Sequence, residues 1–165
     1  MKCWTLCALL LLTWSLQAVG NDNAGDAPSR KVMGYIERIV VLPDNIEAEA
    51  RLDSGANTSS MHALDIEYLD DEERVRFVFE ADGQRATLER PLVRHTRIVQ
   101  HSGERDRRPV ASVEFCLDGR QHEAEFTLTD RSELTYPVLL GRRFLADVAL
   151  IDPAVERTLS AACPE

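Results

Sequence analysis

Hydrophobic and polar residues alternate along much of the chain, most regularly just before residue 53. From Ile46 to Leu52 every second residue is apolar and the residues between them are charged, and the run continues directly into Asp53. This period of two predicts a half-buried β-strand. The segment 32–41 is rich in β-branched and aromatic residues and ends at Pro43-Asp44, which predicts another strand.

Two Asp-Gly pairs separate further alternating segments. Asp82-Gly83 lies between apolar positions in 75–79 and 86–88, and Asp118-Gly119 lies between those in 113–117 and 124–128. Asp-Gly between alternating runs predicts a tight β-hairpin turn. A short segment, 142–147, has a helical pattern. The sequence therefore predicts a small all-β domain, a barrel or a sandwich.

The first twenty residues have the pattern of a secretory signal peptide. Lys2 precedes a largely apolar run over 3–16, and Ala18-Val19-Gly20 supplies small residues for cleavage. The run is short of the about 20 residues that a membrane span needs, so we expect no span after cleavage and a periplasmic or secreted protein. An uncleaved N-terminal anchor is the alternative. We expect a polar lead-in over 21–30 and a folded domain over 31–165.

Charge and cysteine content narrow the interpretation. A formal net charge of −9 argues against a nucleic-acid partner, because such proteins present a basic face to phosphate. Removal of residues 1–20 leaves two cysteines, Cys116 and Cys163. In an oxidising compartment an even pair predicts a disulfide, which would attach the C-terminal tail to a strand. Two buried thiols are the alternative.

An arginine-rich stretch stands out in this acidic chain. Residues 90–108 contain two histidines and six arginines, at positions 90, 94, 97, 105, 107 and 108. Gly103 and Pro109 indicate a loop. The stretch is either a solvated surface loop or a recognition element for a carboxylate-bearing substrate or partner, because arginine matches carboxylates with two parallel hydrogen bonds. Arg94 and Arg97 are the candidate substrate-binding residues.

Two short motifs carry the candidate chemistry. Leu52-Asp53-Ser54-Gly55-Ala56 places a carboxylate where a strand ends in a turn of small residues, and glycine there permits close approach of another chain. By itself the tripeptide Asp53-Ser54-Gly55 is a weak signal. The second motif, 137–145, is an apolar strand, then Gly141, then a short helical turn that begins with Arg142.

Together these motifs resemble the two signature elements of retropepsin-like aspartic proteases. The longer string 50–63 is similar to a bacterial family of single-domain retropepsin-like proteins, long labelled ATP-dependent zinc proteases. The similarity extends over most of residues 32–153. It implies a closed retropepsin-like β-barrel with one short helix near 142–147.

The resemblance also implies a catalytic pair of aspartates. Because the chain has one Asp-Ser-Gly, the pair would require Asp53 of two chains in a two-fold dimer. Asp53 would be the catalytic carboxylate, Ser54 a brace for the loop, Gly55 a point of close substrate approach and Ala56 a substrate contact. Arg142 would be structural, and the Asp82-Gly83 hairpin is the candidate flap over the cleft.

The family label finds no support in the residues for zinc or ATP. The four histidines are scattered without a His-Glu-x-x-His pattern, and there is no glycine-rich phosphate loop. We therefore expect no metal or cofactor. Glutamate ligases often accompany this family, which implies peptide or protein substrates with added glutamate. The alternative to an exported endopeptidase is a non-catalytic module that binds a peptide or a partner protein.

Overall fold

The computed structural model describes residues 30–99 and 105–163. The expected signal peptide 1–20 and nearly all of the lead-in lie outside the described residues. Between residues 30 and 163 the described parts form ten strands, one α-helix and one 3₁₀ turn: β1 (Lys31–Val41), β2 (Ile46–Asp53), β3 (Ser59–His62), β4 (Leu64–Leu69), η1 (Asp70–Glu72), β5 (Arg74–Ala81), β6 (Gln84–Val99), β7 (Arg105–Leu117), β8 (Arg120–Thr129), β9 (Val138–Gly141), α1 (Arg142–Val148) and β10 (Ala149–Glu156).

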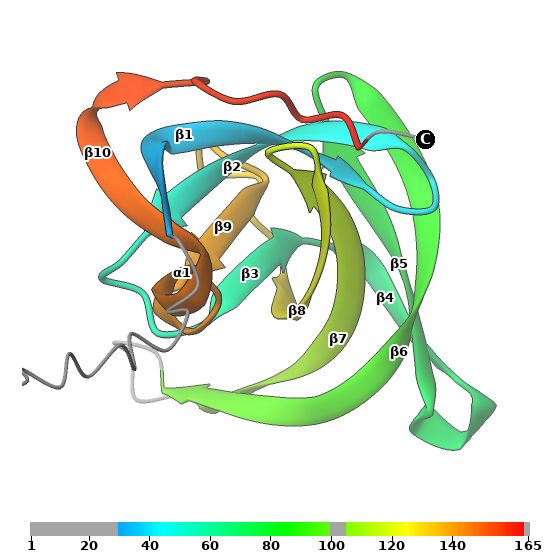
Figure 1. Ribbon diagram of the computed structural model, residues 1–165. Helices are drawn as coiled ribbons and strands as arrows, with labels where there is room; N and C mark the ends of the chain where they lie inside the picture. The colour runs from blue at the N-terminus through cyan, green and yellow to red at the C-terminus, as the bar shows by residue number, and fades with distance from the viewer. Residues whose placement is uncertain (1–29, 100–104, 164–165) are drawn as a thin grey trace, which may run out of the picture.

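Six of these strands close into a barrel through the pairing of β1 with β7, and Figure 1 shows how they are arranged. Their order is β1-β2-β9-β3-β8-β7, and β7 returns to β1 through the pairs Val40 with Cys116 and Val41 with Phe115. β10 pairs in parallel with β1, and β6, β5 and β4 extend the sheet beyond β7. The prediction of a closed retropepsin-like barrel with one short helix after residue 141 is confirmed.

The alternation that predicts the strands also fills the barrel. Ile46, Ala48, Ala50 and Leu52 are buried along β2, while the charged residues between them face outward. The largest fully buried side chains include four phenylalanines, Phe77, Phe79, Phe115 and Phe126. Each contributes roughly 2–3 kcal/mol by leaving water, so the hydrophobic core holds the barrel together. No helix of the described residues is long and apolar enough to cross a membrane.

Both Asp-Gly pairs form the predicted hairpin turns. Asp82 and Gly83 have φ of 48° and 78°, and Asp118 and Gly119 have 55° and 67°. Two consecutive residues with positive φ match the twist of antiparallel strands. These turns join β5 to β6 and β7 to β8.

The arginine-rich stretch 90–108 is not a loop, and that prediction is wrong. Its described residues belong to β6 and β7, where Thr96 pairs with Arg108 and Arg97 with Arg107, and only the tip, 100–104, lies outside the described residues. Carboxylates pair with several of these charges. Arg94 pairs with Glu125, Arg107 with Glu72 and Arg108 with Asp106.

The C-terminal segment is fastened across the barrel. The predicted disulfide between Cys116 and Cys163 is present, with their Cα atoms 5.5 Å apart. In the chain-entropy model a loop of this length adds about 4 kcal/mol of stability. The fully buried Glu37 of β1 also accepts hydrogen bonds from the Thr158 hydroxyl at 2.6 Å and the Leu159 N–H at 3.2 Å. The tail is therefore part of the folded domain.

Candidate active site

Asp53 is the last residue of β2, and its own loop fixes the side chain. Its Oδ1 accepts the N–H of Gly55 at 2.9 Å and that of Ala56 at 3.2 Å, and the Ala56 N–H also lies 3.2 Å from the Asp53 carbonyl oxygen. Oδ2 lies 3.8 Å from the Arg51 Nε, and the side chain keeps 27% of its surface exposed. One carboxylate oxygen is therefore anchored and the other remains accessible.

The first residues of α1 hold the Asp53 loop in place through hydrogen bonds. The Arg142 N–H donates to the Ala56 carbonyl at 2.7 Å, and the Arg143 N–H donates to the Asn57 carbonyl at 3.2 Å. The Arg142 guanidinium donates to the Ser54 carbonyl at 3.2 Å. These bonds give Arg142 the structural position that the resemblance implied, and they satisfy N–H groups of the first helical turn.

Gly141 lets β9 approach the loop closely. β9 pairs in parallel with β2, with Gly141 beside Asp53, and the Gly141 N–H donates to the Ser59 hydroxyl at 3.1 Å. A Cβ at this position would lie 2.5 Å from the backbone C and O of Thr58. Only glycine fits here without movement of the backbone.

The outer face of β2, β9 and β3 carries a row of side chains next to Asp53. Arg51, Leu139 and Ser60 are in register across the three strands. Asp53 lies two residues beyond Arg51 on the same face, roughly 7 Å along the strand. The buried Arg131 reaches this row, because its Nη1 donates to the Ser60 hydroxyl at 2.8 Å.

A pocket of about 450 Å³ opens beside the loop and this row. Residues from the Asp53 loop, β3, β9, β7, β8 and the connection before β9 line it, including Ala56, Ser60, Leu139, Arg108 and Arg131, and the acidic Asp130 and Glu133. The pocket thus joins a candidate substrate contact predicted from the sequence, Ala56, to two arginines. Arg51 belongs to the predicted strand that ends at Asp53, whereas Arg131 carries no local sequence motif and no pattern in the sequence indicated that it lies near Asp53.

Of the other predicted site residues, Ser54 and Gly55 lie on the Asp53 loop and Arg94 and Arg97 lie on β6. Ser54 and Gly55 are exposed on the loop, and the Ser54 hydroxyl makes no hydrogen bond within the described part of the chain. Arg94 binds Glu125 with two hydrogen bonds, at 3.2 and 2.7 Å, and lines a second pocket with Thr58. Arg97 lies on the opposite face of β6 from Arg94, because successive side chains alternate. The structure therefore brings Arg94, but not Arg97, toward the Asp53 loop.

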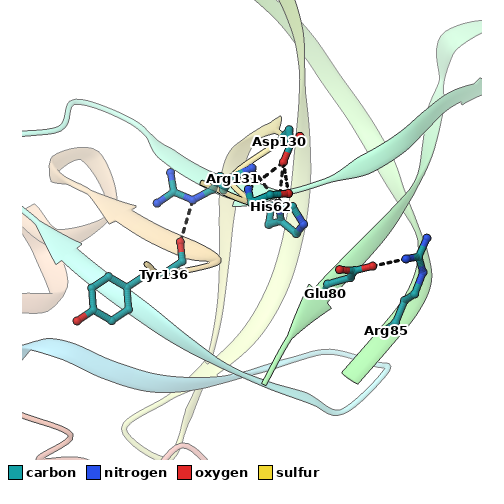
Figure 2. Close-up of polar contacts among 7 residues, drawn as sticks. His62, Glu80, Arg85, Asp130, Arg131 and Tyr136 are labelled. Carbon is teal, nitrogen blue, oxygen red and sulfur yellow. Dashed lines mark hydrogen bonds and ion pairs between the residues drawn. The ribbon is translucent and has the colours of Figure 1, made fainter. Parts of the chain in front are cut away.

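The Asp82-Gly83 turn is not beside the Asp53 loop. It lines a different pocket, with His62 and Arg131. Figure 2 shows the Glu80–Arg85 ion pair of this hairpin across from His62. The hairpin that lines the pockets next to Ala56 and Thr58 is formed by β6 and β7, through Arg94 and Arg108.

The described histidines do not converge on a zinc site. His62 Nδ1 accepts the Arg131 N–H at 2.9 Å, His95 Nδ1 lies 3.0 Å from an Arg107 guanidinium nitrogen, and His122 packs against Phe144. Across residues 30–99 and 105–163 no group of three or more His, Cys, Asp or Glu side chains is arranged to hold a metal ion. The donor set does not fit the zinc of the family label.

Comparison with known proteins places this site in context. A family model described as RimB-like, "Retropepsin-like aspartic endopeptidase RimB", matches residues 32–161. Two proteins named "Probable alpha-L-glutamate ligase" are similar. The one from Shewanella pealeana is 35% identical over 112 residues, which cover 64% of this chain and 24% of that protein. The one from Desulfotalea psychrophila is 36% identical over 117 residues, which cover 67% and 25%.

The chain thus spans about a quarter of the length of these curated relatives. A solved structure is similar over nearly its whole length. It is a Legionella pneumophila protein of unknown function, 28% identical, with a TM-score of 0.71 over 79% of this chain and 98% of that one. The two barrels therefore share their architecture.

Proposed function

Because the chain belongs to the RimB-like family of retropepsin-like aspartic endopeptidases, we propose that it is an exported aspartic endopeptidase that works as a homodimer. The observation that carries the proposal is the Asp53 loop. It has one anchored and one accessible carboxylate oxygen, and hydrogen bonds to α1 hold it in place. The reaction class is hydrolysis of a peptide bond.

The mechanism requires a second carboxylate. The chain contains one Asp-Ser-Gly, so the partner carboxylate is Asp53 of a second copy across a two-fold axis. Two carboxylates in contact cannot both be ionised, so they share one proton. The ionised member takes a proton from water, which attacks the peptide carbonyl, and the protonated member stabilises the charge that develops on the carbonyl oxygen.

The rest of the loop suits substrate contact and dimer contact. Ser54 and Gly55 are exposed beside Asp53. The Ser54 hydroxyl is available to hydrogen bond across the two-fold axis, and Gly55 lets a substrate backbone approach closely. Ala56 contributes to the wall of the adjacent pocket.

The names of the similar proteins indicate a class of substrate. Each contains a segment like this domain within a longer protein named as a glutamate ligase. A peptidase of this type would act on peptides or proteins that bear added glutamate. The chain matches about a quarter of the length of those relatives.

Export is supported by the N-terminal pattern and by the disulfide. Residues 1–20 have the composition of a signal peptide, and the Cys116–Cys163 bridge is typical of an oxidising compartment. N-terminal sequencing of the protein from a periplasmic fraction should begin at residue 21. A start at Met1 in the membrane fraction would indicate the uncleaved anchor instead.

The decisive experiment is a peptide-library cleavage assay between pH 4 and 7, on residues 21–165. We expect Asp53→Asn to abolish cleavage, a loss of at least about a thousandfold for removal of a catalytic group. Asp147→Asn, at an exposed position of α1, is the matched control and should cleave normally. A zinc chelator should have no effect.

Two results would contradict the proposal. Cleavage by Asp53→Asn at the wild-type rate would exclude Asp53 as the catalytic carboxylate. A folded, dimeric wild-type protein that cleaves nothing in the library would favour the non-catalytic module that binds a peptide or partner protein.

A further inference from the structure

Arg131 is a buried cation without an acidic partner. Its exposed fraction is 8%, and within the described residues it forms no ion pair with a carboxylate. A charge is costly to bury unless it is paired. Burial, together with the positive charge of Arg51, accordingly lowers the pKa of the Arg131 guanidinium. An anion at this position would remove that cost.

The guanidinium is held rigidly, with one end free. Its Nε donates to the Tyr136 carbonyl at 3.1 Å and its Nη1 to the Ser60 hydroxyl at 2.8 Å. Figure 2 shows the group extending away from His62. Nη2 makes no hydrogen bond within the described residues and is not among their buried unpartnered atoms, so this end of the guanidinium keeps some exposure. Arg131 lines two pockets, one with Ala56 and one with the Asp82-Gly83 turn.

Arg51 adds a second cation to the same surface. Its side chain is 55% exposed and its nearest acidic partner is Asp53, at 3.8 Å. Arg51 and Ser60 flank Leu139 in one row across the sheet, and Arg131 is bonded to Ser60. Two arginines therefore border the surface where Asp53 is exposed.

We infer that Arg131, assisted by Arg51, forms a subsite that binds one carboxylate of the substrate next to Asp53. The inference rests on the proposed function and adds the residues that determine specificity. A fixed guanidinium with a free end binds a carboxylate at little cost in side-chain entropy. The carboxylate is either an acidic side chain of the peptide or its C-terminus.

The arginines of the β6–β7 hairpin are less suited to this task. Arg94 is paired with Glu125, and Arg108, which lines the same pocket as Arg131, is paired with Asp106 at 2.6 Å. A substrate carboxylate would have to compete with these partners. The structure assigns specificity to Arg131, which the sequence patterns did not single out, in preference to the arginine-rich stretch.

The test is cleavage of matched octapeptides that carry glutamate or glutamine at each position in turn, with a free or an amidated C-terminus. We expect wild type to prefer one charged form by about 10- to 100-fold in kcat/KM, the effect of a charge-assisted hydrogen bond. Arg131→Gln should reduce the preference to near one, whereas Arg131→Lys should retain part of it. Arg38→Gln, an exposed position of β1, is the control and should leave it unchanged.

Binding to the Asp53→Asn protein separates this inference from the proposed function. The probes are a fluorescein-labelled hexapeptide of alanines with one glutamate, its glutamine counterpart, and both with amidated C-termini. If nothing is cleaved but the charged probe binds about tenfold more tightly in an Arg131-dependent manner, the subsite stands and the peptidase proposal fails. If cleavage occurs with equal preference for charged and neutral peptides, the subsite is refuted and the peptidase proposal stands.

A folding defect would not obscure the result. Should Arg131→Gln unfold, Arg51→Gln replaces it, because Arg51 is largely exposed. We expect that variant to weaken the preference several-fold. An unchanged preference in a folded Arg51→Gln protein, alongside a wild-type preference for charge, would overturn the role of Arg51, and a full wild-type preference in a folded Arg131→Lys protein would overturn that of Arg131.

Discussion

Gly141 shows how a single atom can determine the shape of the candidate site. An added Cβ would lie 2.5 Å from the backbone C and O of Thr58, and a backbone cannot rotate away as a side chain can. We expect Gly141→Ala to lower the free energy of unfolding by about 3 kcal/mol, in the range of overpacking substitutions, as measured by urea denaturation. The same substitution should also displace the Asp53 loop, which is hydrogen-bonded to the next residues of α1.

Gly83→Ala is the control for this prediction. It has no neighbouring atom within 4 Å and a φ of 78°, so only the left-handed backbone resists a side chain, at about 1 kcal/mol. Equal destabilisation by the two substitutions would refute the close approach of β9 to the loop.

For single residues, the sequence indicates which side chains carry chemistry, but not which residues distant along the chain lie next to them. Asp53, Gly55 and Gly141 belong to recognisable motifs, so their positions could be predicted. Arg131 could not, because its environment depends on Ser60, which is 71 residues away along the chain. Nor does sequence pattern show that Arg108 meets Asp106, since that pair depends on the extension of β7.

The burial of His122 predicts that the attachment of α1 depends on pH. Its ring packs between Phe115 of β7 and Phe144 of α1, at centroid distances of 5.8 and 5.4 Å. Burial lowers its pKa in the folded protein; a hydrogen bond from the imidazole to the Leu117 backbone and the charge of Asp118 oppose this shift, and Arg120 adds to it. The charged imidazolium is therefore disfavoured in the folded state.

The lowered pKa of His122 makes the folded protein less stable at acidic pH. Because the unfolded chain binds a proton more readily, stability falls as the pH drops below the unfolded value near 6.5. We expect the free energy of unfolding to fall between pH 7.5 and 5.5 in wild type, by up to about 1.4 kcal/mol for each unit that separates the two pKa values. His122→Gln should remove this loss, and a variant with an unchanged pH dependence would refute the assignment.

Strands with regular alternation and Asp-Gly turns were predictable because a local pattern specifies each of them. The hairpin of β6 and β7 was not, because its charged residues have the composition of a loop and only the backbone pairing of the two strands makes it regular structure, with Glu125 of β8 paired to Arg94. The parallel pairings of β2 with β9 and of β3 with β8 join segments distant in sequence. No local periodicity encodes those contacts, although they create the site.

For the whole molecule, the central prediction is that the active unit contains two chains. Within one chain the described contacts of the Asp53 carboxylate are backbone N–H groups and Arg51, so the second carboxylate of an aspartic dyad must come from another copy. A hybrid of one wild-type and one Asp53→Asn chain holds a single carboxylate and should be inactive. Random exchange of equal amounts then leaves about a quarter of the dimers active.

The measurement is cleavage activity at constant total chain concentration, after exchange between wild type and a tagged Asp53→Asn chain, with native mass spectrometry to count the hybrids. Activity should fall to about a quarter of the all-wild-type value, because only dimers with two Asp53 carboxylates can share a proton. A fall to one half would mean that each chain acts alone. That outcome, or full activity of a strict monomer, would require a second carboxylate from within the same barrel and would exclude the two-fold dyad.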